Sequence, residues 1–367
     1  MNQVLIFSGL LVAGMTVSQL IDLSSVRVFL TSITMVCLAY IMIEVGLEFT
    51  IDKKKMGSYG TDYLVAATAA AFPWILCAGY FIFVFGTDWK DALLAGRFAA
   101  PTSAGVLFTM LAAAGLASTW LFKKARILAI FDDLDTVLFM IPLKMLIVGL
   151  KPELGLVVFV IGVLLFLGYK YLHVWRIPTG KNWLLMYAVI IAVICDLFYR
   201  AVNVHLEVLL PAFILGCVIH FSHEYALDNH QVSKQEKVLD KAMKYLFMLL
   251  VGLSLPKIDL AGVSLGVVAW HVLIVTVLAN LGKCYASFCY RKEASLRERI
   301  ALSVAMLPRG EVGAGVLLVS IGYGITGLSI TVAALSLALN LLMTGVFIMI
   351  IMKLIKHDPN QGKLKTP

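Results

Sequence analysis

The sequence predicts an all-α polytopic membrane protein of about twelve transmembrane helices, folded as one domain over residues 1–367. Hydrophobic residues make up 61% of the chain and charged residues only 14%. A soluble domain is nearer half apolar and a quarter charged. Apolar runs long enough to cross a bilayer recur from end to end, so little chain is left for a soluble domain.

The apolar runs define the candidate spans. They cover residues 4–21, 27–50, 62–85, 91–117, 126–149, 153–172, 182–200, 206–221, 240–255, 262–290, 299–322 and 328–354. The first run lacks the basic segment and the small-residue cleavage site of a signal peptide, so we expect it to be retained as a span.

Basic residues separate the two sides of this layout. The loops after even-numbered spans, counted with the adjoining span ends and the C-terminal tail, hold 21 of the 30 lysines and arginines, and the opposite loops with their span ends hold 5. Because cytoplasmic loops are enriched in Lys and Arg, both termini are expected in the cytoplasm. The net charge of +8 is then a topology signal, and no nucleic-acid partner is expected. The other four basic residues, Arg97, Lys144, Lys283 and Arg309, lie inside spans.

Spans 4 and 11 are both interrupted by segments that contain proline and glycine, at residues 99–105 and 308–315. Proline removes a helix hydrogen bond, and glycine weakens the helix. Both breaks are expected near the membrane midplane, roughly 15 Å from where each span enters. Discontinuous helices at matching positions of two halves indicate inverted-topology repeats whose broken helices cross at a transport site.

The two halves also share a spacing. Pro101 precedes Asp133 by 32 residues, and Pro308 precedes Asn340 by the same 32. Asn340 is the lone strongly polar residue of span 12, so it is the candidate counterpart of Asp133 in the second repeat. The alternative is that the two equal separations arise by chance.

Three carboxylates, Asp132, Asp133 and Asp135, lie inside span 5. Each costs about 2.5–3.5 kcal/mol at the centre of a membrane helix, whereas a flanking apolar residue recovers only about 0.3–0.6 kcal/mol. We therefore expect these side chains to face protein or water and to serve a function.

Lys283 lies about as deep in span 10 as Asp132 does in span 5, at roughly 9–12 Å from the cytoplasmic ends. A buried lysine needs a charged partner, and either Asp132 or Asp133 could supply it. The other aspartate could bind a small cation and a proton in turn, and that competition would couple their transport. The hydroxyls of Thr102 and Ser103 in broken span 4 are further candidate oxygen ligands.

Five motifs, in order, resemble the monovalent cation–proton antiporter superfamily, in its paired-aspartate sodium–proton branch with the NhaA-type fold. They are Gly46-Leu47-Glu48, Thr102-Ser103-Ala104-Gly105, Asp132-Asp133, Leu281-Gly282-Lys283 and Pro308-Arg309-Gly310-Glu311-Val312-Gly313. The resemblance covers nearly all of the chain.

The resemblance implies that Asp133 is the carboxylate that binds protons and, transiently, Na⁺. It implies that Asp132 is salt-bridged to Lys283. It also implies electrogenic exchange of protons for sodium or lithium across the cell (inner) membrane, in the service of pH homeostasis. No cofactor is expected beyond the transported ions, which are Na⁺, Li⁺ or K⁺ together with H⁺.

The resemblance further implies a homodimer embedded in the lipid bilayer. Residues 1–61 and 182–255 would form a scaffold that carries the dimer contact. Residues 62–150 and 262–356 would form an ion-transport core that shifts like an elevator, and residues 152–172 would be the linker helix.

Several polar residues of the spans keep open roles. Asp135 is a third carboxylate beyond the paired motif. Arg97 is expected either to pair with Glu44 or Asp135, or to extend its charge to the membrane surface. Lys144 lies near the outer end of span 5 and is expected to extend to the surface in the same way.

Arg309 and Glu311 lie on either side of Gly310 in the break of span 11. We expect them to form a structural ion pair that holds the broken helix. Direct coordination of the transported ion is the alternative.

Other functions on the same fold stay open. One is a potassium–proton antiporter or a gated potassium-efflux channel, and another is a membrane sensor that does not transport. An enzyme is not expected, because an intramembrane aspartyl protease needs catalytic aspartates on separate helices, one in a Gly-x-Gly-Asp context, and the sequence has neither.

Overall fold

The computed structural model describes most of the chain. It covers residues 2–21, 23–48, 56–103, 107, 111, 115–116, 119–139, 142–143, 145, 152–172, 174–202, 208–219, 234–254 and 264–356. Within these residues the regular secondary structure is helical, apart from one isolated bridge between Trp175 and Ile219. The predicted all-α class is confirmed.

Each predicted span overlaps at least one helix of the described chain. The long helices are α1 (Asn2–Leu20), α2 (Arg27–Glu48), α3 (Met56–Phe85), α6 (Trp120–Leu138), α8 (Pro152–Lys170), α9 (Lys181–Val202), α12 (Lys234–Ser254), α13 (Leu265–Lys283) and α16 (Leu328–Lys356). The shorter ones are α4 (Trp89–Gly96), α10 (Leu209–Val218), α14 (Leu296–Ala305) and α15 (Glu311–Gly322), with 3₁₀ turns η1 (Ser24–Val26), η3 (Arg97–Ala99) and η4 (Cys284–Phe288).

Five helical stretches of the described chain are long and apolar enough to cross a membrane alone. They are Val28–Leu47, Gly60–Phe85, Lys181–Phe198, Leu265–Phe288 and Leu328–Ile355. The predicted spans 4 and 11 fall short of this length because each is broken near its middle.

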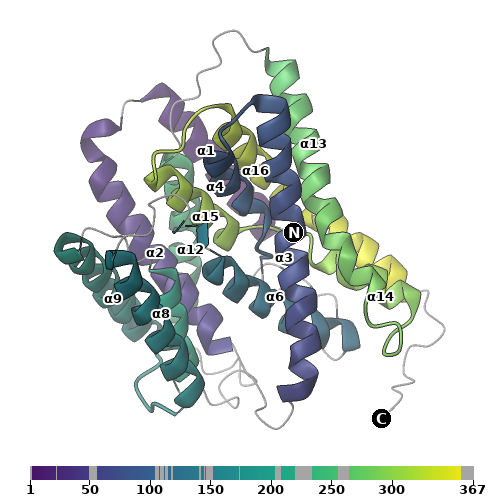
Figure 1. The fold of residues 1–367 in the computed structure, drawn as a ribbon, viewed down its shortest axis with the longest axis horizontal. Coiled ribbons are helices and arrows are strands. Elements are labelled where there is room, and N and C mark those ends of the chain that lie inside the picture. The colour runs from purple at the N-terminus through teal and green to yellow at the C-terminus, as the bar shows by residue number, and fades with distance from the viewer. Residues whose placement is uncertain are drawn as a thin grey trace.

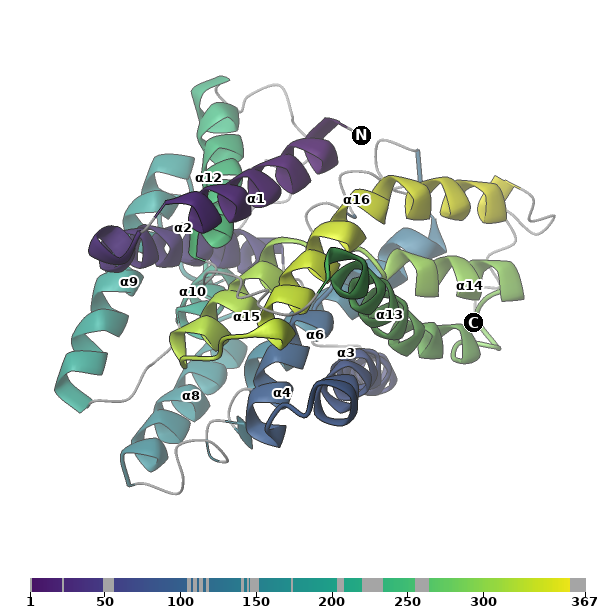
Figure 2. The ribbon, with the colours of Figure 1, turned by 90° about the horizontal axis from the view of Figure 1, so that it is seen from above.

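The helices gather into two groups (Figures 1 and 2). In one group α2 packs against α9, α10 and α12, α1 packs against α12, and α10 packs against α8. In the other group α3 packs against α4, α6 and α13, and α16 packs against α13 and α14. Helix α15 contacts α12 and α2 on one side and α16 and η3 on the other, so it lies between the groups.

Two close helix crossings relate the halves of the chain. Gly14 of α1 meets Gly252 of α12, where a Cβ on Gly14 would lie 2.4 Å from the Leu249 carbonyl oxygen. Gly46 of α2 meets Gly216 of α10 in the same way. Gly216 follows Gly14 by 202 residues, so α10 is the repeat counterpart of α1. Gly252 follows Gly46 by 206 residues, so α12 is the counterpart of α2. The α1–α12 crossing of one repeat is therefore equivalent to the α10–α2 crossing of the other. These crossings agree with the predicted repeat.

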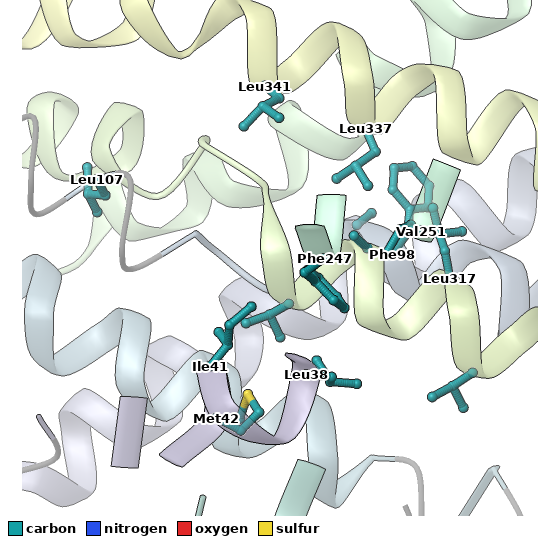
Figure 3. Close-up of a cluster of buried hydrophobic side chains, with 14 of the residues drawn as sticks. Leu38, Ile41, Met42, Phe98, Leu107, Phe247, Val251, Leu317, Leu337 and Leu341 are labelled. Carbon is teal, nitrogen blue, oxygen red and sulfur yellow. The ribbon is translucent and has the colours of Figure 1, made fainter. Parts of the chain in front are cut away.

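The interface between the two groups is apolar. Figure 3 shows Leu38, Ile41 and Met42 of α2 with Phe247 and Val251 of α12 facing side chains of η3, α15 and α16. These side chains belong to one continuous buried core.

Candidate ion-binding site

Two non-helical segments meet where spans 4 and 11 are broken. Residues 101–103 follow η3, and residues 307–310 separate α14 from α15. Proline in each segment lacks the amide donor that a continuous helix would use. The Ser103 amide donates a 2.8 Å hydrogen bond to the Pro308 carbonyl, so the two breaks contact each other directly.

Asp132 of α6 lies beside this crossing and is fully buried, with 0% exposure. Its Oδ2 atom is 2.7 Å from the Lys283 ammonium and 2.7 Å from the Thr102 hydroxyl. Lys283 also donates to the Ala100 carbonyl, and the Thr102 hydroxyl lies 3.0 Å from the Met306 carbonyl oxygen. The structure thus brings three residues singled out from the sequence into one buried cluster.

Lys283 therefore pairs with Asp132, one of the two partners that depth alone allowed. The pairing is the one that the family resemblance implies. Asp133 is the next residue of α6, and Glu311 is the first residue of α15, but their side chains lie outside the described residues. The Ser103 side chain is buried at the crossing, 1% exposed.

Arg309 holds the broken helix through neutral acceptors. Its guanidinium donates to the Ala99 carbonyl at 3.0 Å, the Ala279 carbonyl at 2.7 Å and the Asn280 side-chain oxygen at 2.7 Å. The side chain is 0% exposed, so these bonds replace the water that the charge loses. The structural role expected of Arg309 fits these contacts, whereas its pairing with Glu311 stays a prediction.

Asn340 of α16 caps the same break. Its Oδ1 accepts a 3.1 Å hydrogen bond from the Arg309 backbone amide, and its amide nitrogen donates to Asn280 Oδ1 at 2.7 Å. Asn280 of α13 was not among the predicted site residues. The available signal was a polar residue three positions before Lys283, on the same face of an apolar helix.

Arg97 does not extend to the membrane surface. It is 2% exposed, and its guanidinium donates to the Thr136 carbonyl of α6. Glu44, which we considered as its partner, forms ion pairs with Lys181 and Lys244. Buried Arg97 thus fixes η3 against α6 at the residue that follows Asp135. Lys144, which was expected to extend to the surface, lies outside the described residues.

A second polar cluster lies at the opposite end of α3 from α4. Asp62 is 3% exposed; its Oδ1 accepts a 2.7 Å hydrogen bond from Tyr290 and forms a 3.0 Å ion pair with Lys124. Lys124 also pairs with Glu293 at 3.1 Å and lies 4.5 Å from the centre of the Tyr290 ring. Burial and the bond to Asp62 raise the pKa of the Tyr290 phenol. The cluster ties α3, α6 and the segment after η4 together.

A third polar cluster joins α2, α9 and α12. Glu44 pairs with Lys181 and, at 3.0 Å, with Lys244, which also pairs with Asp240 at 3.0 Å. This cluster was not predicted, because its members come from helices far apart in the chain.

Taken together, these features define a class of protein. A polytopic helical chain whose two discontinuous helices cross beside a buried carboxylate–lysine pair has the architecture of a secondary ion transporter. The chain belongs to the sodium/hydrogen exchanger family, whose transmembrane family model matches residues 3–354. It is therefore a membrane-embedded cation–proton antiporter by family, and the predicted superfamily is confirmed.

Solved structures agree with this fold. The sodium proton antiporter MjNhaP1 from Methanocaldococcus jannaschii at pH 8 superposes with a TM-score of 0.68 at 16% identity, covering 95% of this chain and 92% of that one. An electron-microscopy structure of MjNhaP1 gives 0.65 at 14% identity, covering 95% and 91%. At these identities the likeness concerns the fold. No relative was found among curated proteins.

Proposed function

We propose that this protein is a secondary active antiporter that exchanges sodium or lithium for protons across the cell (inner) membrane. The observation that carries the proposal is the fully buried Asp132–Lys283 pair at the crossing of the two broken helices. A charged pair at membrane depth is costly, and residues of this kind mark ion pathways in transporters.

Asp133 is the exchange carboxylate in this proposal, and repeat symmetry supports the assignment. Asn340 follows Asp133 by 207 residues, just as Arg309 follows Thr102 by 207. In the second repeat the Asn340 side chain accepts a hydrogen bond from the Arg309 amide within the break. By this symmetry we assign Asp133 to the first break, at Thr102, whose hydroxyl and neighbouring carbonyls are hard oxygen ligands of the kind that sodium prefers.

Coupling follows from competition for one carboxylate. A proton and a sodium ion cannot occupy the Asp133 carboxylate together, so each turnover carries one or the other. Asp132 pairs with Lys283, which balances its charge as long as the lysine is protonated. If Lys283 also gains and loses a proton, exchange moves net charge, and a potential of 100 mV then changes its driving force by about 2.3 kcal/mol per charge.

Alternating access comes from relative movement of the two helix groups. The α1, α2, α9, α10 and α12 group is the scaffold, and residues 62–150 and 262–356 form the moving core, with α8 as linker. The interface between α2 or α12 and α15 or α16 supports an elevator-like shift, because the labelled side chains that meet there are apolar and burial of apolar surface is non-directional. Two copies associate through the scaffold, with both termini in the cytoplasm.

Flux in proteoliposomes tests the proposal. Sodium added to vesicles with an imposed pH gradient should dissipate the gradient, and Asp133→Asn should abolish this effect. Asp196→Asn is the matched control, because this exposed carboxylate of α9 pairs only with Arg200 among the described residues. Retained exchange in Asp133→Asn would rule out the assignment of Asp133. Potassium flux with single-channel currents would indicate a potassium channel. The absence of flux with every alkali cation would indicate a membrane sensor that does not transport.

A further inference from the structure

A closed ring of hydrogen bonds holds the second break, which is the segment of residues 307–310 between α14 and α15. The Arg309 guanidinium donates to Oδ1 of Asn280 at 2.7 Å, and the Arg309 backbone amide donates to Oδ1 of Asn340 at 3.1 Å. The Asn340 amide nitrogen then donates to the same Asn280 oxygen at 2.7 Å. Because a backbone amide can only donate, it fixes the orientation of Asn340, and Asn340 in turn requires Asn280 to present its oxygen.

The two asparagines come from helices that are held in register. Asn280 belongs to α13 and Asn340 to α16. One helical turn earlier on each helix, the hydroxyls of Thr276 and Ser336 lie 2.8 Å apart and are also buried. The asparagine pair extends this register to the second break, because Arg309 is bonded to both of its members.

The second break in turn holds the first break, residues 101–103. The Ser103 amide donates to the Pro308 carbonyl at 2.8 Å, and the Thr102 hydroxyl lies 3.0 Å from the Met306 carbonyl oxygen. A Cβ on Gly310 would lie 2.7 Å from Oγ of Ser103, so the two breaks leave no room for a larger residue there. The position of Thr102, and of the oxygen ligands proposed around it, therefore depends on where the second break is held.

We propose that Asn280 is a positioning residue that determines cation specificity. Together with Asn340 it fixes the second break against α13 and α16, and so sets the spacing of the oxygen ligands at the first break. Alkali cations carry the same charge and differ in size, so an oxygen site separates them by cavity size, ligand number and flexibility. The proposal rests on the antiport and deepens it: Asn280 acts on the cation through Arg309 and is not itself a ligand.

The opposing interpretation is that the ring only stabilises the fold. Three substitutions separate the two interpretations. Asn280→Ala removes both bonds that this side chain accepts, whereas Asn280→Asp keeps an oxygen for both of them. Ser336→Ala is the matched control, because it removes a buried bond from the same α13–α16 contact one turn away from the ring. A purely stabilising ring predicts that these variants differ in unfolding midpoint and share the ion preference of the wild type.

The test is competition of lithium and potassium against radioactive sodium on the purified protein, together with the KM of exchange for each cation in proteoliposomes. We expect Asn280→Ala to raise the KM for sodium by about threefold to tenfold, because misplaced groups bind less well. The ratio between the KM values of the least and the most preferred cation should fall by at least about threefold, because a looser ligand set discriminates size less. Asn340→Ala opens the same ring and should act alike, so either variant that folds decides. Asn280→Asp and Ser336→Ala should keep the wild-type ratio.

The outcomes distinguish this inference from the proposed function. If the wild type exchanges sodium and the alanine variants keep its ratio, or if Ser336→Ala changes the ratio as much as they do, the role of Asn280 is overturned and the antiport stands. If the wild type binds sodium without exchanging it, and the alanine variants alone change the competition by lithium and potassium, the antiport is wrong and the role of Asn280 stands. A wild-type protein that neither binds nor exchanges sodium overturns both.

Discussion

The Lys283 ammonium lies 2.7 Å from Oδ2 of Asp132, and both side chains are 0% exposed. Each charge has lost its water, so each depends on the other and on hydrogen bonds from the crossing. Removal of one partner from such a pair leaves an uncompensated buried charge, whereas removal of both partners does not. The pair therefore makes a prediction about stability that is independent of transport.

Lys283→Met should lower the free energy of unfolding by about 3–5 kcal/mol, because Asp132 is left buried without its cation. The double variant Asp132→Asn/Lys283→Met should recover most of that loss. Unfolding midpoints in detergent would measure both effects, with Lys241→Met as the control because Lys241 is exposed on α12. Equal losses in the single and double variants would contradict the coupling of these two residues.

Arg309→Lys should destabilise the crossing by at least about 2 kcal/mol, because bonds to a charged donor are worth about 1.5–3 kcal/mol each. The planar guanidinium reaches Ala99, Ala279 and Asn280 at once, and one ammonium cannot reproduce that fork. Thermal unfolding of the variant would be compared with Arg291→Lys, which changes an exposed arginine in the same way. A similar unfolding midpoint for both variants would show that the Arg309 hydrogen bonds do not stabilise the crossing.

Counting along the sequence predicted that Asp132 and Lys283 lie at the same depth, because a helix rises by a constant amount per residue. That regularity matched the depths of Asp132 and Lys283, and the prolines at 101 and 308 marked the breaks that meet in the structure. The side-chain placement of Asp133 and Glu311 stays a prediction.

Contacts that lack a sequence signature were not predictable in this way. Arg309 binds the backbone carbonyls of Ala99 and Ala279, and any residue carries such a carbonyl. Arg97 had three possible placements, which were pairing with Glu44, pairing with Asp135 and extension to the membrane surface. The depth of a residue in its helix does not say which neighbouring helix lies beside it. The Glu44–Lys244 pair joins helices whose relative height is set by packing and not by periodicity.

Gly14→Ala and Gly9→Ala should have opposite effects although both glycines belong to α1. A Cβ on Gly14 would lie 2.4 Å from the Leu249 carbonyl oxygen, so the α1–α12 crossing must separate, at a cost of about 1–3 kcal/mol. A Cβ on Gly9 meets nothing within 4 Å, and alanine there should stabilise the helix by about 0.5–1 kcal/mol. Unfolding midpoints that shift in the same direction would show that the close crossing is absent in solution.

Tyr290→Phe should reduce stability most at neutral pH and least at high pH. The Tyr290 hydroxyl donates to Asp62 at 2.7 Å, and burial together with this bond raises the pKa of the phenol above its usual value of about 10. A raised pKa in the folded state means that the contribution is complete below pH about 10 and is lost as the pH rises above it. The loss of stability in the variant should be about 1.5–3 kcal/mol near pH 8, as for a bond to a charged group, and should shrink toward pH 11.

Unfolding midpoints measured across this pH range check the trend. The control is Tyr187→Phe, because the Tyr187 hydroxyl makes a longer 3.3 Å bond to the Pro178 carbonyl. A difference between wild type and Tyr290→Phe that stays constant with pH would mean that the phenol does not lose its proton on unfolding at these pH values.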